Sequence, residues 1–220
     1  MQEAAIAFQK SNDSFVLAFR GTTTTRENLV DASALLSREK DGVVDAFAAA
    51  YARSGLRDQV DALHASTGAS VHFISGHSLG GAFATLAAQQ CVSAALVTWA
   101  GARTVTPERC RASQARGTSH LAVVNAQDAV PFLHSLVASS CQCCPVVLLN
   151  AAPSSSLHSR LLTHDILYYG YALLLLGSLG PREAGQCGLS ALCAPAEACF
   201  LEVEPFPPFA ELMRALPSPA

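Results

Sequence analysis

Short runs of apolar residues alternate along the first two thirds of the chain with segments in which apolar residues recur every three or four positions. The runs predict strands, and the spaced segments predict helices. The first two runs, 4–9 and 15–19, flank a polar stretch and predict a β-hairpin. Further strands are expected at 71–75, 94–100, 120–125 and 144–149, and helices at 41–64, 79–88, 107–115 and 163–177.

This alternation predicts parallel crossovers, and therefore a three-layer α/β fold with a mostly parallel central sheet. In such folds ligands bind at the carboxyl ends of the strands. We expect residues 1–180 to form one domain. Residues 181–220 are rich in Pro, Gly, Ala and Cys without a sustained period, so we expect a tail that is poorly ordered or loosely packed.

Composition narrows the classes of partner. Of the 220 residues, 50% are hydrophobic and 14% are charged. A chain of this length and hydrophobic content can bury one sizeable core. A net charge of −3 without a basic stripe argues against nucleic acid. The longest apolar run, 166–179, is interrupted by glycines and too short for a transmembrane segment. The first ten residues lack a signal-peptide pattern, which favours a cytoplasmic protein, with secretion open if the amino terminus is incomplete.

The chain has eight cysteines, which is many for a sequence without an export signal. Their spacing lacks the paired pattern of zinc sites, so no metal is expected. Disulfides in a secreted protein are one interpretation, and buried or inert thiols are the other. Without an export signal, the thiol interpretation is favoured.

One stretch carries a chemical signature: Gly76-His77-Ser78-Leu79-Gly80, between a predicted strand and a predicted helix. In this G-x-S-x-G arrangement the serine sits on a strained turn, and the glycines avoid collisions between the strand and helix backbones. The helix that follows directs its N–H groups and positive end toward charge that develops near the serine oxygen. Ser78 is therefore predicted to be the nucleophile of an acyl-transfer site.

A serine nucleophile needs an imidazole to take its proton and a carboxylate to hold that imidazole. In α/β-hydrolases the acid follows the serine in the chain. The acids between Ser78 and residue 180 are Glu108, Asp128 and Asp165. Glu108 suits the first turn of a surface helix, and Asp165 is directed elsewhere on a helix. Asp128 directly follows a strand and is predicted to be the catalytic acid.

The base should follow the acid, which leaves His134, His158 and His164. His134 is too near Asp128 in the chain to reach the far side of the serine. His158 lies in a Ser-rich loop, and His164 opens the last predicted helix. Both positions suit a catalytic histidine, and the residues alone favour His164 slightly.

The second predicted strand runs into a polar loop, Arg20-Gly21-Thr22, at the carboxyl end of a central strand. The backbone N–H of Thr22 is expected to supply half of an oxyanion hole. The next segment, 28–37, has apolar residues on one side of a helix. It is interpreted either as a small lid over the site or as a fixed surface helix.

Four segments resemble motifs of the class 3 (fungal-type) lipase family. Residues 19–22 resemble its F-R-G-[ST], and residues 75–82 its [TS]-G-H-S-L-G-G-A. Residues 124–131 resemble its V-N-x-x-D-x-V-P, and His164 with Tyr168 and Tyr169 resembles its final D-H-x-x-Y. The likeness covers residues 4 to about 179 and raises the preference for His164 over His158.

The resemblance implies a compact α/β-hydrolase and a serine esterase or lipase that hydrolyses carboxylic esters of acylglycerols or related lipids. It implies Ser78 as nucleophile, Asp128 as acid and His164 as base. The implied oxyanion hole consists of the backbone N–H groups of Thr22 and Leu79. No metal or organic cofactor is implied.

The implied partners are a lipid or small ester and, transiently, a membrane or lipid-droplet surface. Asp31 falls where the family has an acid after its lid helix. One alternative is a phospholipase A1 or an acyltransferase that uses the same site. Another is a catalytically silent, lipase-like scaffold that binds a ligand or partner.

Overall fold

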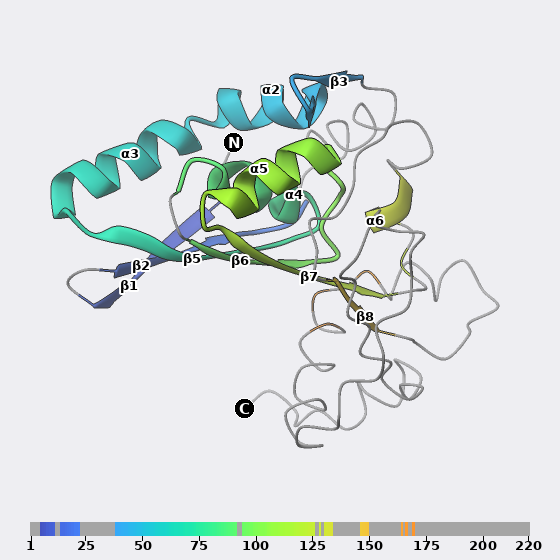
Figure 1. Ribbon diagram of the computed structural model, residues 1–220. Helices are drawn as coiled ribbons and strands as arrows, with labels where there is room; N and C mark the ends of the chain where they lie inside the picture. Colours follow the sequence, from blue (N-terminus) through green and yellow to red (C-terminus); the bar gives the residue numbers. More distant parts are fainter. Residues whose placement is uncertain are drawn as a thin grey trace, which may run out of the picture.

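The computed structural model describes residues 5–11, 14–22, 38–91, 94–125, 128, 130–133, 146–149, 164, 166 and 169. Its centre is a six-stranded sheet with the strand order β1-β2-β5-β6-β7-β8 (Figure 1). β1 pairs with β2 in the predicted antiparallel hairpin, and every other neighbouring pair is parallel. The strands are β1 (Ala5–Ser11), β2 (Ser14–Phe19), β5 (Ser70–His77), β6 (Ala95–Trp99), β7 (Ser119–Asn125) and β8 (Val146–Leu149).

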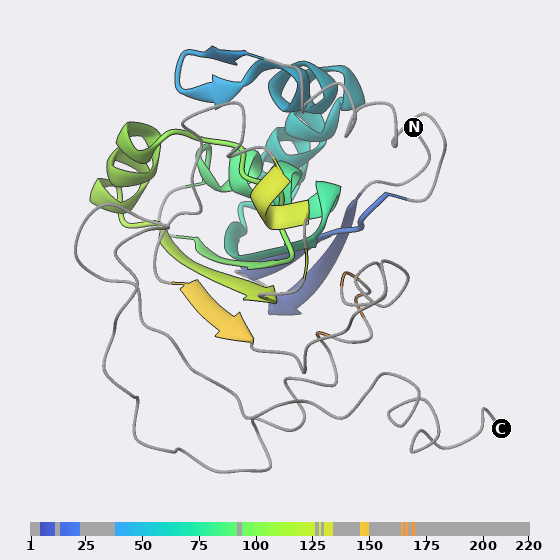
Figure 2. The ribbon, with the colours of Figure 1, turned by 90° about the vertical axis from the view of Figure 1, so that its right-hand side faces the viewer.

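The helices confirm the predicted α/β alternation. They are α2 (Asp45–Ser54), α3 (Leu56–Thr67), α4 (Leu79–Ala88), α5 (Pro107–Ala115) and α6 (Val130–Leu133). The four longer helices, α2 to α5, lie on one face of the sheet (Figures 1 and 2). The third layer stays a prediction, because the described part of the chain places no long helix on the other face. The predicted tail, 181–220, and the segment 28–37 lie outside the described residues.

The prediction of one long helix at 41–64 is wrong. Residues 39–44, which overlap its start, form a small antiparallel hairpin of β3 (Glu39–Lys40) and β4 (Val43–Val44), in which Val44 N also donates to Thr104 O at 2.8 Å. The remainder splits into α2 and α3 at Gly55, which has φ 69°. Glycine adopts this left-handed conformation without steric cost, and such a residue commonly ends a helix. The helical backbone is therefore interrupted at Gly55, although the spacing of apolar residues continues across it.

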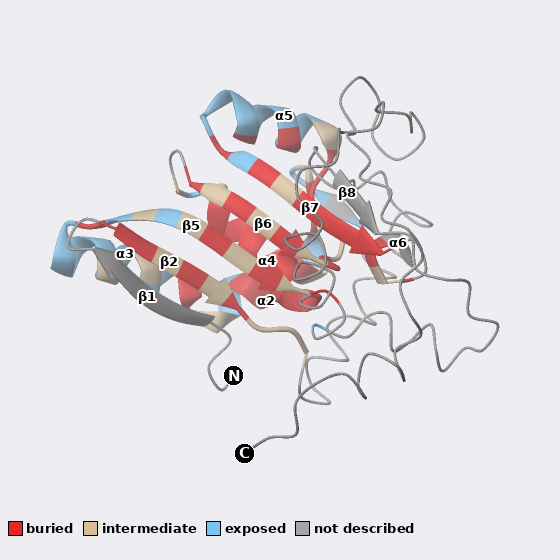
Figure 3. Cartoon of the chain, turned by 90° about the horizontal axis from the view of Figure 1, so that it is seen from below, coloured by how far each residue is buried: buried red, intermediate tan, exposed pale blue. Residues whose placement is uncertain are grey.

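The core lies between α2, α4 and the sheet. All ten residues of α4 are buried, and many of them are small, so this helix packs closely on β2, β5 and β6. From α2, Phe47 and Tyr51 join the same core, and the rings of Tyr51 and Phe83 are 5.8 Å apart. Figure 3 shows the buried residues concentrated along the central strands and α4.

The parallel register brings the carboxyl ends of the central strands to one edge. Phe19 at the end of β2 pairs with Gly76 on β5, and His77 pairs with Trp99 at the end of β6. Trp99 in turn pairs with Val123 on β7. The segments that follow β2, β5 and β7 therefore start at the same edge of the sheet, although they are far apart in the sequence.

Two cysteines lie in the described part of the chain. Cys91 is a free thiol, and burial with the nearby Asp61 raises its pKa to about 11. Cys110 on α5 is disulfide-bonded, so the favoured interpretation of inert thiols is wrong at this position. The other six cysteines lie outside the described residues. Among the described helices, none combines the length and apolar character needed to cross a bilayer.

Candidate active site

Ser78 occupies the sharp turn between β5 and α4. Its φ of 57° and ψ of −125° place it in a conformation that non-glycine residues rarely adopt. The turn is held from both sides, because Ser78 N donates to Trp99 O at 3.0 Å and Gly81 N donates to Ser78 O at 2.9 Å. The strained serine predicted by the sequence is present.

The neighbouring glycines are required by close backbone approach. A Cβ on Gly76 would lie 2.1 Å from Gly80 O, and one on Gly80 would lie 2.3 Å from Arg20 O. Both distances are far below van der Waals contact. The start of α4 therefore packs directly against the elbow strand and against the end of β2, which agrees with the reason that the motif predicts glycine.

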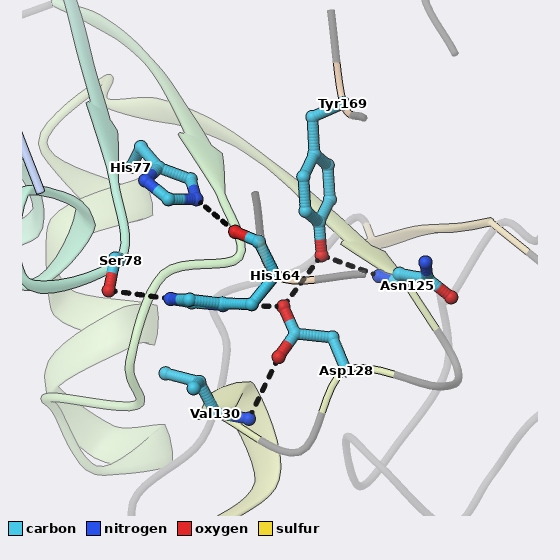
Figure 4. Close-up of polar contacts among 7 residues, drawn as sticks. All are labelled: His77, Ser78, Asn125, Asp128, Val130, His164 and Tyr169. Carbon is cyan, nitrogen blue, oxygen red and sulfur yellow. Dashed lines mark hydrogen bonds and ion pairs between the residues drawn. The ribbon is translucent and has the colours of Figure 1, made fainter. Parts of the chain in front are cut away.

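His164 lies between Ser78 and Asp128 (Figure 4). Its Nε2 is 2.8 Å from Ser78 Oγ, and its Nδ1 is 2.7 Å from Asp128 Oδ2. A carboxylate accepts hydrogen bonds, so Nδ1 carries the proton and Nε2 faces the serine hydroxyl as an acceptor. The structure thus brings together three residues from segments 36 to 86 positions apart.

The carboxylate of Asp128 is enclosed and saturated with donors. The residue is 1% exposed. Its Oδ1 accepts a hydrogen bond from Val130 N at 2.9 Å, and its Oδ2 accepts one from the Tyr169 hydroxyl at 2.9 Å in addition to that from His164. Val130 is two residues on, so Asp128 forms the Asx turn that closes this strand as well as the contact with the histidine.

The two segments predicted to form the oxyanion hole lie beside Ser78. Leu79 is the first residue of α4, where backbone N–H groups lack a partner within the helix. Thr22 follows Gly21, at which an added Cβ would lie 3.3 Å from Ser78 Cβ. The loop after β2 therefore runs against the nucleophile, and both backbone segments lie beside it.

Among the residues weighed and set aside, Glu108 is exposed in the first turn of α5, as expected. His134, His158, Asp165 and Asp31 lie outside the described residues. Within the described ranges, no three His, Cys, Asp or Glu side chains group closely enough to hold a metal ion.

Two contacts of the site were not anticipated from the sequence. The hydroxyl of Tyr169, a fully buried residue, accepts from Asn125 N at 3.0 Å while it donates to Asp128. The side chain of His77 donates from Nε2 to the main-chain oxygen of His164 at 2.7 Å. The signals were present, since Tyr169 stands near His164 in the chain and His77 is the histidine of the elbow, but neither contact follows from spacing.

Solved structures to which this chain is similar include lipases from fungi. The lipase of Rhizomucor miehei, a triacylglyceride lipase, is 21% identical, with 58% of this chain and 54% of that chain covered and a TM-score of 0.43. The lipase of Rhizopus microsporus var. chinensis is 20% identical over 58% and 50%, with a TM-score of 0.45. The N225Q form of MDLA from Penicillium cyclopium is 23% identical over 68% and 64%, with a TM-score of 0.47.

The chain thus spans about half the length of the first two of these lipases. Among curated proteins, none matches the sequence. The model of the class 3 lipases matches residues 16–137, which is more than half of the chain and includes the loop after β2, the elbow and Asp128. The chain therefore belongs to the class 3 lipase family.

Proposed function

We propose that this protein is a serine esterase or lipase that hydrolyses carboxylic esters of acylglycerols or related lipids through an acyl-enzyme on Ser78. The observation that carries the proposal is the continuous path from Ser78 Oγ through the His164 ring to Asp128, with contacts of 2.8 and 2.7 Å. These are the distances that proton transfer and charge stabilisation require.

In the first half of the reaction, His164 Nε2 takes the hydroxyl proton as Ser78 Oγ attacks the ester carbonyl carbon. The imidazole becomes positively charged, and the buried carboxylate of Asp128 stabilises that charge and holds the ring. At this strained turn Oγ is directed toward Nε2 of His164 (Figure 4). Serine and base are therefore arranged before substrate arrives, so little reorganisation is needed.

The carbonyl oxygen becomes an oxyanion in the tetrahedral intermediate. We assign the backbone N–H groups of Thr22 and Leu79 to it. Gly21, directly before Thr22, lies against Ser78, and Leu79 follows Ser78 as the first residue of a helix, where the positive end of the helix dipole is. Loss of one such donor costs about 100- to 1,000-fold in rate in other serine hydrolases.

The intermediate collapses when His164 donates its proton to the leaving alcohol oxygen, which leaves the acyl group on Ser78. Water then attacks the acyl-enzyme, His164 takes one of its protons, and the carboxylic acid departs as Ser78 Oγ regains a proton. Each bond that breaks is matched by one that forms, so no cofactor is needed.

The test compares hydrolysis of a short p-nitrophenyl ester and of emulsified tributyrin by the wild type and by Ser78→Ala. We expect the variant to lose at least about 1,000-fold in rate, since the nucleophile is gone. Ser70→Ala serves as the matched control, because Ser70 is exposed at the far end of the same strand. A Ser78→Ala protein that keeps its rate would overturn the proposal.

A fluorophosphonate probe and a headgroup panel separate the alternatives. The probe should label the wild type and leave Ser78→Ala unlabelled, whereas a silent scaffold would not be labelled at all. Acylglycerols should be cleaved faster than phospholipids, and water should be the main acyl acceptor. Preference for the sn-1 ester of a phospholipid, or acyl transfer to an added alcohol in place of hydrolysis, would instead indicate the phospholipase A1 or acyltransferase.

A further inference from the structure

His77 belongs to the elbow that carries Ser78, and its side chain contacts the segment that carries His164. It is the last residue of β5, directly before Ser78, and its half-buried side chain extends toward His164 (Figure 4). Its Nε2 lies 2.7 Å from the main-chain oxygen of His164, 87 positions along the chain. A carbonyl oxygen only accepts hydrogen bonds, so Nε2 of His77 carries a proton.

The other side of the same ring faces the loop that carries Thr22. A Cβ on Gly21 would lie 2.9 Å from His77 Nδ1 and 3.2 Å from His77 O. The glycine of this loop thus leaves room for the imidazole. His77 fills the space between the loop after β2 and the segment that bears His164.

Asp128 and His77 contact different parts of His164. Asp128 binds the ring of His164 and sets its orientation, whereas His77 binds the main chain and sets where the residue stands relative to the elbow. His77 is the chain neighbour of Ser78, so the hydrogen bond links the nucleophile and the base through one residue. We propose that His77 is a positioning residue that fixes the distance between His164 Nε2 and Ser78 Oγ. This inference rests on the proposed hydrolase function.

Charge explains why a histidine suits this position. The rings of His77 and His164 are 4.9 Å apart between centroids and tilted by 37°. During the reaction the ring of His164 becomes positively charged, and a permanent cation at this distance would oppose that charge. A neutral imidazole donates the hydrogen bond without this penalty. The same reasoning predicts that a neutral amide of similar reach can replace it.

The experiment compares His77→Leu, which removes the donor, with His77→Gln, which places an amide N–H near the position of Nε2. We expect kcat on a soluble ester to fall about 10- to 100-fold in His77→Leu, because a displacement of about 1 Å has effects of this size. KM should stay within about twofold, and His77→Gln should recover most of the loss in kcat. His72→Leu, at an exposed position on the same strand, is the matched control and should keep the wild-type rate.

Two results would overturn the inference: kcat of His77→Leu equal to that of the wild type, or kcat of both variants falling only in proportion to a shared loss of thermal stability. If His77→Leu does not fold, the ¹⁵N shifts of the wild-type His77 ring, assigned by comparison with His77→Gln, decide instead. The inference requires a protonated Nε2 and fails if the proton is on Nδ1. A wild type that no fluorophosphonate labels would refute the hydrolase itself, while the ring shifts would still report on the His77 contact.

Discussion

At the residue scale, the site is held by polar groups that are each used more than once. Asp128 accepts from a backbone N–H, a tyrosine hydroxyl and an imidazole, and Tyr169 is both donor and acceptor. Such a network fixes protonation as well as position, because every acceptor defines which neighbour must carry a proton. Changes at a single atom should therefore have large effects on the rate and smaller effects on the fold.

Asp128→Asn tests the tautomer of His164. The amide keeps the size of the carboxylate, but an amide N–H directed at Nδ1 favours the tautomer with the proton on Nε2, which cannot accept the proton of Ser78. We expect kcat on a soluble ester to fall by roughly 10,000-fold, which is the loss caused by this change in the triad of a serine protease. A circular dichroism spectrum like that of the wild type is the control, and a loss below tenfold would contradict the assignment.

Tyr169→Phe removes one buried hydroxyl from the same network. The backbone N–H of Asn125 loses this acceptor and Asp128 loses one donor, so the free energy of unfolding should fall by about 1–3 kcal/mol. The rate should fall much less than in Asp128→Asn, because Val130 N and His164 still hold the carboxylate. Urea unfolding and kcat measured on the same preparation test both parts. A stability equal to that of the wild type would show that the hydroxyl contributes nothing.

The sequence indicated Ser78 and Asp128 more directly than it indicated the residues that contact them. Ser78 and Asp128 were predicted from local signals, because the elbow motif and an acid just after a strand are both recognised from a few consecutive residues. The choice between His158 and His164 could not be made from loop position, because it depends on how a distant segment folds back. The structure places His164 beside Ser78, whereas His158 lies outside the described residues.

At the scale of elements, the site depends on how closely α4 approaches the ends of β2 and β5. Gly76, Gly80 and Gly81 lack a Cβ where backbone atoms of other segments lie within 3 Å. The sequence indicated this approach through the elbow motif. Gly55 indicated a weak point in the apolar pattern at 41–64, but periodicity did not show two helices there, because it reports which face is buried and not whether the backbone is continuous.

Gly80→Ala and Gly68→Ala separate steric overlap from backbone strain. At Gly80 a Cβ would lie 2.3 Å from Arg20 O, so either α4 or the loop after β2 must move. We expect the free energy of unfolding to fall by more than about 3 kcal/mol, or the folded protein to be lost. Gly68 has φ +67° with open space around it, so its substitution should cost only about 1–2 kcal/mol.

Urea unfolding of the two glycine variants measures both costs. The matched pair matters because each substitution adds the same methyl group, one against backbone oxygen and one into open space. Equal costs at the two positions would show that α4 can shift to accommodate the methyl group. In that case the packing at the elbow would be looser than the structure indicates.

At the scale of the whole molecule, the stability of the fold should depend on pH through a residue away from the site. His120 on β7 is buried, and its Nε2 lies 3.0 Å from Thr98 Oγ1. Neither its Nδ1 nor Thr118 Oγ1 has a hydrogen-bond partner among the described residues. Both residues line a small cavity between α4, α5, β6 and β7. Burial lowers the pKa of His120 from 6.5 to about 3.

The sign of the effect follows from this pKa. Between pH 6.5 and about 3 the unfolded chain binds a proton on His120 that the folded protein does not, so acid favours unfolding. The free energy of unfolding should therefore decrease as the pH falls through this window, with a contribution of up to about 1.4 kcal/mol per pH unit from this residue. His120→Gln keeps a hydrogen-bonding group for Thr98 and cannot titrate, so its stability should depend less steeply on pH.

Urea unfolding at pH 4.5, 5.5 and 7 compares the slopes of the two proteins, with exposed His72→Gln as the control that should keep the wild-type slope. Carboxylates titrate in the same window but are common to all three proteins, so the difference in slope isolates His120. Parallel slopes for wild type and His120→Gln would mean that the ring takes up its proton without leaving the core.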